Sequence, residues 1–194
     1  MPWDPLKDYQ MMKRNTECFM SLWRSLKPVI CKVHGAAVGG GSDIALCCDI
    51  VLMADNAIVG YPPARVWGCP TTSMWVYRIG AEKAKRMMLT GDVISGVEAA
   101  KMGLVYASYP ESELDAHVMS LANKMTEIPI NQLMMQKLVI NQVYDNMGIE
   151  NTQILATVMD GVARHTPEGV EFKNTAERYG FKEAIRRRDV ISKL

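Results

Sequence analysis

The chain has 194 residues, of which 48% are apolar and 22% charged, and its formal net charge is +1. That length allows one compact domain with its own core, while the near-neutral charge argues against a broad nucleic-acid surface or a polybasic membrane patch. No apolar run reaches the roughly 18 residues of a membrane-spanning helix, and residues 1–13 are too polar for a signal peptide, so we expect a cytoplasmic protein that binds neither nucleic acid nor membrane.

The cysteines do not suggest a metal or disulfide framework. There are five, an odd number, and none forms a C-x-x-C pair. Cys47 and Cys48 are adjacent, which suits neither an ordinary disulfide nor a zinc site. We expect all five to be small buried hydrophobic residues in a reducing compartment, and we predict no metal site.

The first half of the chain predicts strands that alternate with helices. Asp4 and Pro5 form a helix start, and apolar residues recur at helical spacing until Pro28 stops the run. A buried strand over 29–33 then leads into a glycine-rich turn over 34–41. The next expected elements are a short buried helix over 42–48, a strand over 49–54 and a brief strand over 57–59.

The second half predicts a loop, two further helices, one strand and then helices alone. Residues 61–70 hold three prolines and are expected to form the loop, after which a helix begins near Thr71. Ser95 is expected to cap a helix that Gly103 ends, and a strand should follow over 104–107. From Pro110 onward, proline and glycine separate four predicted helices, over 111–128, 130–146, 150–165 and 168–179.

This order predicts an α/β fold. We expect an α/β core over residues 1–109 and an all-helical extension over 110–194. The helices of the extension have broad apolar faces and little core of their own, so we expect them to pack on a partner subunit.

The segment HGAAVGGG, residues 34–41, is the candidate functional motif. Three consecutive glycines at a helix start offer unscreened N–H groups, which stabilise an anion. Their spacing fails the G-x-G-x-x-G fingerprint, and Asp43 would repel a P-loop phosphate. A transition-state oxyanion fits better, with a carboxylate nearby to move protons. The alternative is a tight turn that needs glycine only for packing.

Two segments carry a resemblance to a known family. KPVICKVHGAAVGGGSDIALCCD (27–49) and, in the right order, AEKAKRMMLTGDVISGVEAAKMGLV (81–105) resemble the crotonase, or enoyl-CoA hydratase/isomerase, family. The similarity extends from about residue 26 to residue 189. It implies a crotonase-like ββα spiral core, a helical C-terminal extension that forms a homotrimer or hexamer, and an acyl-CoA thioester substrate with no other cofactor. A lyase or isomerase of fatty-acid metabolism is therefore expected.

The resemblance also implies residue roles. The Gly40 N–H would be one of two oxyanion-hole donors to the thioester oxygen, with Gly39 beside it in the substrate site. Asp43 stands where hydratases of the family have a glutamate, and would act as the acid/base; a first-turn acid that answers the helix dipole is the alternative. The second hydratase glutamate corresponds to Pro63, which cannot transfer a proton. Classical hydration is therefore not expected, while isomerisation or another enolate reaction stays open.

The proline-rich loop supplies further candidates for substrate binding. Arg65 would meet a polar acyl group and Trp67 would form a pocket wall, with surface or packing roles as the alternatives. Cys69 lies in the same loop, but no histidine is near it in the sequence, so a nucleophilic role is not expected. Residues 186–188 are three arginines that would either contact coenzyme A phosphates or match the helix dipole.

The resemblance implies further strands before the first predicted helix, and these would supply the second oxyanion donor. Either the gene product is longer than this chain, or the oxyanion hole holds one donor, a loss that typically costs on the order of 10²–10³ in rate. The second hypothesis is therefore an inactive acyl-CoA-binding or scaffolding protein. A third, RNA binding, is disfavoured by the near-neutral charge.

Overall fold

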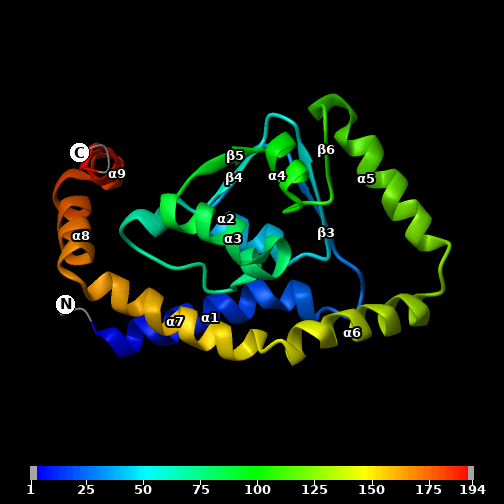
Figure 1. Cartoon of the computed structure of the whole chain (residues 1–194), viewed down its shortest axis with the longest axis horizontal. Coiled ribbons are helices and arrows are strands. Elements are labelled where there is room, and N and C mark those ends of the chain that lie inside the picture. Colours follow the sequence, from blue (N-terminus) through cyan, green and yellow to red (C-terminus); the bar gives the residue numbers. More distant parts are fainter. Residues whose placement is uncertain (1–3, 192–194) are drawn as a thin grey trace.

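The computed structural model describes residues 4–191 and places two small sheets above a layer of long helices (Figure 1). One sheet is parallel throughout, in the order β1-β3-β6. The other has the order β2-β4-β5, with β2 and β4 parallel and β5 antiparallel to β4. The strands are β1 (Ile30–Val33), β2 (Ala36–Val38), β3 (Ile50–Ala54), β4 (Ile58–Gly60), β5 (Val93–Ser95) and β6 (Ala107–Tyr109).

The chain alternates between the two sheets, which produces a ββα spiral. β1 and β2 enter different sheets and are followed by α2 (Gly40–Leu46); β3 and β4 repeat the path and lead to α3 (Met74–Thr90). Successive turns stack in register, with Ile30 opposite Ile50 and Ala36 opposite Ile58. This is the ββα spiral core that the sequence predicts.

The core lies between the sheets and the helices packed on them. Leu52 of β3, Trp75 and Met87 of α3, and Met20 of α1 (Pro5–Arg24) are all buried. Each such side chain stabilises the fold by roughly 1.5–3 kcal/mol relative to exposure.

Local signals place the helix ends where the sequence predicts them. The Asp4 side chain accepts hydrogen bonds from the N–H groups of the first turn of α1. Ser95 and Glu98 form a capping box at the start of α4 (Gly96–Met102), and Gly103 ends it at φ 83°. A Cβ on Gly96 would lie 2.1 Å from the Ala54 carbonyl oxygen, so close packing of α4 on β3 requires glycine there.

The C-terminal part of the described chain is helical, as expected. α5 packs on the parallel sheet, α7 lies along α1, and α8 packs on α9 (Figure 1). Lys137 of α6 is buried and pairs with Asp49 at 2.7 Å, which ties α6 to the core. The helices are α5 (Glu111–Thr126), α6 (Ile130–Asn146), α7 (Ile149–His165), α8 (Pro167–Tyr179) and α9 (Phe181–Ile191). The division of the chain near residue 110 into two regions stays a prediction.

Several short elements differ from the predictions. β2 lies inside the predicted turn over 34–41, and neither β5 nor α9 was predicted. The strand predicted over 104–107 is instead β6, because pairing with β3 begins only at Ala107. The proline-rich loop contains a 3-10 turn, η1 (Pro62–Arg65). Three-residue strands are too short to show alternation, so only their pairing partners define them. Within residues 4–191, no helix is long and apolar enough to cross a membrane.

Candidate active site

The glycine turn after β2 holds its backbone in a conformation that favours glycine. Gly39 has φ 59° and ψ −125°, and its N–H donates to the Gly60 carbonyl at 3.0 Å. The Gly39 carbonyl accepts from Ser42 N–H at 2.9 Å and Asp43 N–H at 3.2 Å. Gly40 begins α2, and the first N–H groups of a helix have no partner within it. The role of the Gly40 N–H as an oxyanion donor stays a prediction.

Apolar side chains of α1 and η1 lie close to the glycine turn. A Cβ on Gly40 would lie 3.7 Å from Phe19 Cζ of α1, and a Cβ on Gly39 would lie 3.5 Å from Pro63 Cγ of η1. The structure therefore brings Pro63 and the glycine turn together, although Pro63 lies 23 positions after Gly40 in the sequence. Such neighbours lower the local dielectric constant, which strengthens a hydrogen bond to a developing anion.

Asp43 is a buried carboxyl group in the first turn of α2. Its residue is 2% exposed, and its Oδ1 accepts a hydrogen bond from Thr72 Oγ1 at 2.5 Å. The Asp43 pKa is raised to about 7, chiefly by burial, with a smaller upward contribution from the charge of Asp160 and with the Thr72 hydrogen bonds acting in the opposite direction. A carboxyl group that titrates near neutrality can both accept and return a proton.

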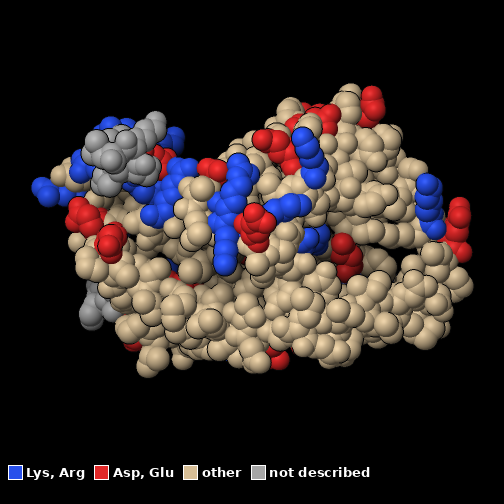
Figure 2. Space-filling view, viewed as in Figure 1, with Lys and Arg blue, Asp and Glu red and all other residues tan. Residues whose placement is uncertain are grey.

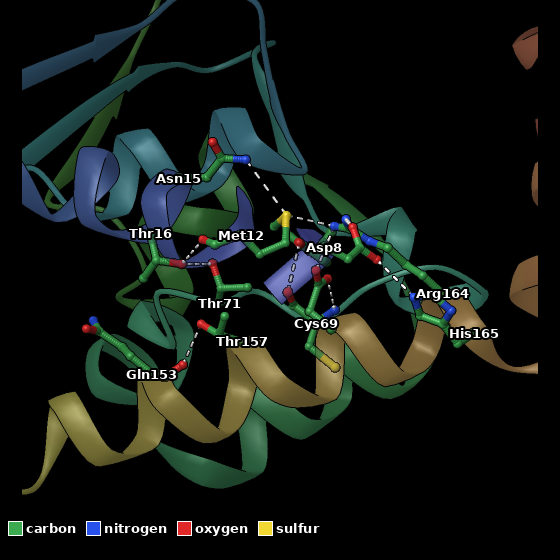
Figure 3. A network of polar contacts seen from close by, with 12 residues as sticks. Asp8, Met12, Asn15, Thr16, Cys69, Thr71, Gln153, Thr157, Arg164 and His165 are labelled. Carbon is green, nitrogen blue, oxygen red and sulfur yellow. Dashed lines mark hydrogen bonds and ion pairs between the residues drawn. The ribbon is translucent and has the colours of Figure 1, made fainter. Parts of the chain in front are cut away.

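The loop between β4 and α3 is anchored to two helices through a buried polar network (Figure 3). The Tyr61 hydroxyl donates to the Cys69 carbonyl at 3.1 Å, and Cys69 N–H donates to Asp160 Oδ1 at 3.0 Å. Arg164 then bridges two carboxylates, with 2.6 Å to Asp160 Oδ2 and 2.6 Å to Asp8 Oδ1. The network joins the loop to α7 and α1.

The end of that loop is a turn over residues 71–73 that is also held by neighbouring helices. Thr16 of α1 donates to the Thr71 hydroxyl at 2.6 Å, and Gln153 Nε2 of α7 donates to the Thr72 carbonyl at 3.0 Å. Ser73 adopts a left-handed conformation, with φ 59° and ψ 11°, just before α3 begins. A non-glycine residue stays in that region only when its surroundings hold it there.

The other predicted substrate-binding residues of the loop contact the C-terminal helices. Arg65 Nε donates to the Thr90 carbonyl at 3.2 Å, and Arg65 Nη1 pairs with Asp189 of α9 at 3.2 Å. The Trp67 ring packs on Phe172 of α8 with centroids 5.2 Å apart. A cavity of about 350 Å³ opens beside Phe172, and its lining includes Arg65, Val66 and Phe172 but not Trp67.

Cys69 and the arginines of residues 186–188 were two further candidates from the sequence. Burial, and secondarily Asp160, raises the pKa of the Cys69 thiol, so the reactive thiolate is disfavoured at neutral pH. Arg186 and Arg187 both pair with Glu183 on the surface of α9, at 2.7 and 2.9 Å.

Thr72, Gln153 and Asp160 are the residues of the site that the sequence analysis missed. In the sequence, Thr72 belongs only to the predicted start of the helix near Thr71. Gln153 and Asp160 are seven residues apart, so they lie on one face of α7. Polar residues repeated at that spacing, with Thr157 between them, were the available signal for a buried polar face.

Comparisons with known proteins agree on one family. The family model for enoyl-CoA hydratase/isomerase matches residues 4–183. A probable mitochondrial enoyl-CoA hydratase of Dictyostelium discoideum is 33% identical over 133 residues, which cover 65% of this chain and 48% of the relative. An (E)-benzylidenesuccinyl-CoA hydratase of Thauera aromatica is 33% identical over 165 residues, covering 82% and 62%.

Solved structures of the same kind superpose closely. An enoyl-CoA hydratase of Mycobacterium smegmatis has a TM-score of 0.93 and 48% identity, over 97% of this chain and 65% of that one. An enoyl-CoA hydratase/isomerase of Novosphingobium aromaticivorans has a TM-score of 0.87 and 28% identity, over 95% and 69%. The chain thus spans about half the length of the first curated relative and about two thirds of these structures.

Proposed function

The chain belongs to the enoyl-CoA hydratase/isomerase family, and from that premise we propose that it processes acyl-CoA thioesters through an enolate bound at the glycine turn. The observation that carries the proposal is Asp43, a buried carboxyl group with a pKa of about 7, three residues after the Gly40 N–H. Enolate formation requires two groups, a hydrogen-bond donor to the anionic oxygen and a base that accepts a proton at neutral pH.

The proposed chemistry proceeds in two proton transfers. The thioester oxygen accepts a hydrogen bond from Gly40 N–H while the Asp43 carboxylate removes a proton from the α-carbon. The electron pair of the broken C–H bond moves to the thioester oxygen and forms the enolate. Asp43 then returns a proton to the acyl chain, either at the α-carbon or further along an unsaturated chain, which moves the double bond.

Pro63 favours single-carboxylate chemistry over classical hydration. Family hydratases use two carboxyl groups, and Pro63 stands at the second position, against Gly39. Isomerisation or another enolate reaction of the thioester is therefore preferred. The same observation favours the second candidate function, an acyl-CoA-binding or scaffolding protein without turnover.

Exchange of the α-proton for deuterium separates these two functions. Acyl-CoA thioesters are incubated with the protein in heavy water, and incorporation is measured by mass spectrometry. We expect exchange above the protein-free blank, its loss in Asp43→Asn, and calorimetric acyl-CoA affinity that is nearly unchanged in that variant. Equal binding without exchange in the unmodified protein would support the scaffolding function instead.

The proposal includes assembly into a homotrimer or hexamer. Large apolar side chains of α6 and α7 are exposed, among them Val139 at 70% and Leu155 at 58%. Figure 2 shows that the lower band of this face, where Figure 1 places α6 and α7, carries almost no charged side chains. A second copy would cover such a surface. Sedimentation of a clean monomer at micromolar concentration would contradict this assembly.

A further inference from the structure

The turn over residues 71–73 is the one segment that contacts Asp43 with a side-chain hydrogen bond in the part of the chain described. Thr72 Oγ1 donates to Asp43 Oδ1 at 2.5 Å, and both residues are buried. No other element of the enolate chemistry proposed above involves Thr72, so the contact calls for a separate account.

A hydrogen bond to one oxygen of a carboxylate restricts the rotation of the side chain. The Thr72 hydroxyl bonds Oδ1 and so holds the plane of the Asp43 carboxyl group. A carboxylate held in one rotamer by a neighbouring donor keeps a reacting geometry that a free carboxylate would sample only part of the time.

Helix α7 holds the turn that carries Thr72. Gln153 donates to the Thr72 carbonyl at 3.0 Å, and Asp160 accepts from Cys69 N–H at 3.0 Å. These two residues of α7 therefore anchor both ends of the segment 69–72. Figure 3 shows Cys69, Thr71 and Gln153 gathered along α7 with Thr16 of α1 on the other side of the turn. Ser73 directly follows this segment in a left-handed conformation, and the surrounding contacts must maintain that conformation.

We propose that Thr72 is a positioning residue for Asp43, and that α7 keeps it in place through Gln153 and Asp160. The effect on catalysis rests on the proposed function, whereas the hydrogen bond between Thr72 and Asp43 does not depend on it. Thr72 is thus a side chain outside the glycine motif that orients the acid/base and shifts its pKa.

The titratable groups near Asp43 determine how its pKa would change if the Thr72 hydroxyl were lost. Asp160, from α7, raises the Asp43 pKa, whereas Thr72 lowers it. Burial raises the pKa of Tyr61, and raises that of Cys47 to about 12, so both stay neutral at pH 7. Loss of the Thr72 hydroxyl removes the larger of the two Thr72 hydrogen bonds that lower the Asp43 pKa and leaves the backbone one, so the Asp43 pKa should rise.

The test compares Thr72→Val, which removes the hydroxyl and keeps the shape, with Thr72→Ser, which keeps the hydroxyl. The first readout is the pH midpoint of α-deuterium exchange. We expect an upward shift of about one unit in Thr72→Val, from the loss of a hydrogen bond to a charged group, and recovery in Thr72→Ser. Thr175→Val, at a buried threonine of α8 that bonds Glu171, is the matched control and should not move the midpoint.

A second readout does not depend on turnover. The carboxyl pKa of Asp43 is measured by infrared difference spectroscopy across pH, with Asp43→Asn to identify its band. The same upward shift is expected in Thr72→Val, and Thr72→Ala carries the test if the valine variant does not fold. Gln153→Leu should lower the exchange rate, by up to about 10²-fold, with little change in KM.

The outcomes separate this inference from the proposed function. Loss of exchange in Asp43→Asn together with unchanged midpoint and infrared pKa in Thr72→Val would overturn the positioning role and leave the function standing. Full exchange in Asp43→Asn would overturn the function, while a shifted infrared pKa in Thr72→Val would still support the Thr72 contact.

Discussion

Arg164 Nη2 lies 2.6 Å from Asp160 Oδ2, and this ion pair joins two residues one turn apart on helix α7, next to the loop between β4 and α3. Asp160 also accepts the Cys69 N–H, and Arg164 pairs on its other side with Asp8 of α1. One guanidinium therefore neutralises two buried carboxylates and joins three segments of the chain.

Replacement of Arg164 should destabilise the fold strongly. Arg164→Met leaves Asp8 and Asp160 buried without their shared cation, and breaking a buried pair typically costs about 3–5 kcal/mol. Urea unfolding followed by circular dichroism measures the loss. Arg186→Met, which removes an exposed pair with Glu183, is the control and should change stability little. Equal effects of the two variants would show that the Arg164 network does not stabilise the fold.

Asp43 should lower stability at neutral and alkaline pH. Chiefly through burial, its pKa rises from the ordinary range of an aspartate to about 7, so the folded state holds the proton more tightly than the unfolded chain does. The contribution of this group is therefore fully favourable below about pH 4 and is lost as pH rises through 7. Asp43→Asn, which cannot ionise, should be more stable than the unmodified protein at pH 8, on the order of a few kcal/mol.

The measurement is the free energy of unfolding of both proteins at pH 5 and pH 8. The advantage of Asp43→Asn should grow between the two values. A difference that does not change with pH would mean that the Asp43 carboxyl has an ordinary pKa in the folded protein.

The glycines of the turn should differ in their tolerance of alanine. Gly39→Ala places a Cβ on a residue with φ 59° and ψ −125°, which costs about 1–3 kcal/mol and displaces the Gly40 N–H. Gly41→Ala is the matched control, because its Cβ would meet only the Ala36 carbonyl oxygen at 4.0 Å. Thermal unfolding and deuterium exchange should both decline in Gly39→Ala. Similar behaviour of the two variants would argue that the turn is not conformationally constrained.

Charge on the exposed apolar face of α6 and α7 should dissociate the assembly. Val139→Glu and Leu155→Glu place a carboxylate on that face, where burial against a second copy would be unfavourable. Leu89→Glu is the control, because Leu89 is 82% exposed at the end of α3. Analytical ultracentrifugation should show a lower mass for the first two variants alone. Loss of assembly in all three would indicate nonspecific association.

The elements that depend on local chemistry could be predicted from the sequence, and those that depend on distant pairing could not. Asp4, the Ser95 cap and Gly103 mark helix ends through contacts within a few residues. β2 and β5 become strands only because β4 lies between them. The predicted strand near Leu104 failed for a related reason, since Leu104 is buried without being paired in the sheet.

The same distinction applies to the candidate site. Gly40 and Asp43 both lie in the segment 27–49 that resembles the family, and that resemblance predicted their roles. Thr72 reaches Asp43 across 29 residues and Asp160 reaches Cys69 across 91, and no pattern in the sequence indicates which distant residue each of them contacts. Side chains from other elements that shift the pKa of the acid/base can be identified only in the folded structure.

The role of Asp43 is tested most directly by the rate of α-deuterium exchange into an acyl-CoA thioester as a function of pH, in the unmodified protein and in Asp43→Asn. We expect a rate that rises through a midpoint near pH 7, as the Asp43 carboxylate forms, and no exchange above the blank in Asp43→Asn. Exchange that persists in Asp43→Asn with the same pH dependence would contradict the assignment of Asp43 as the base.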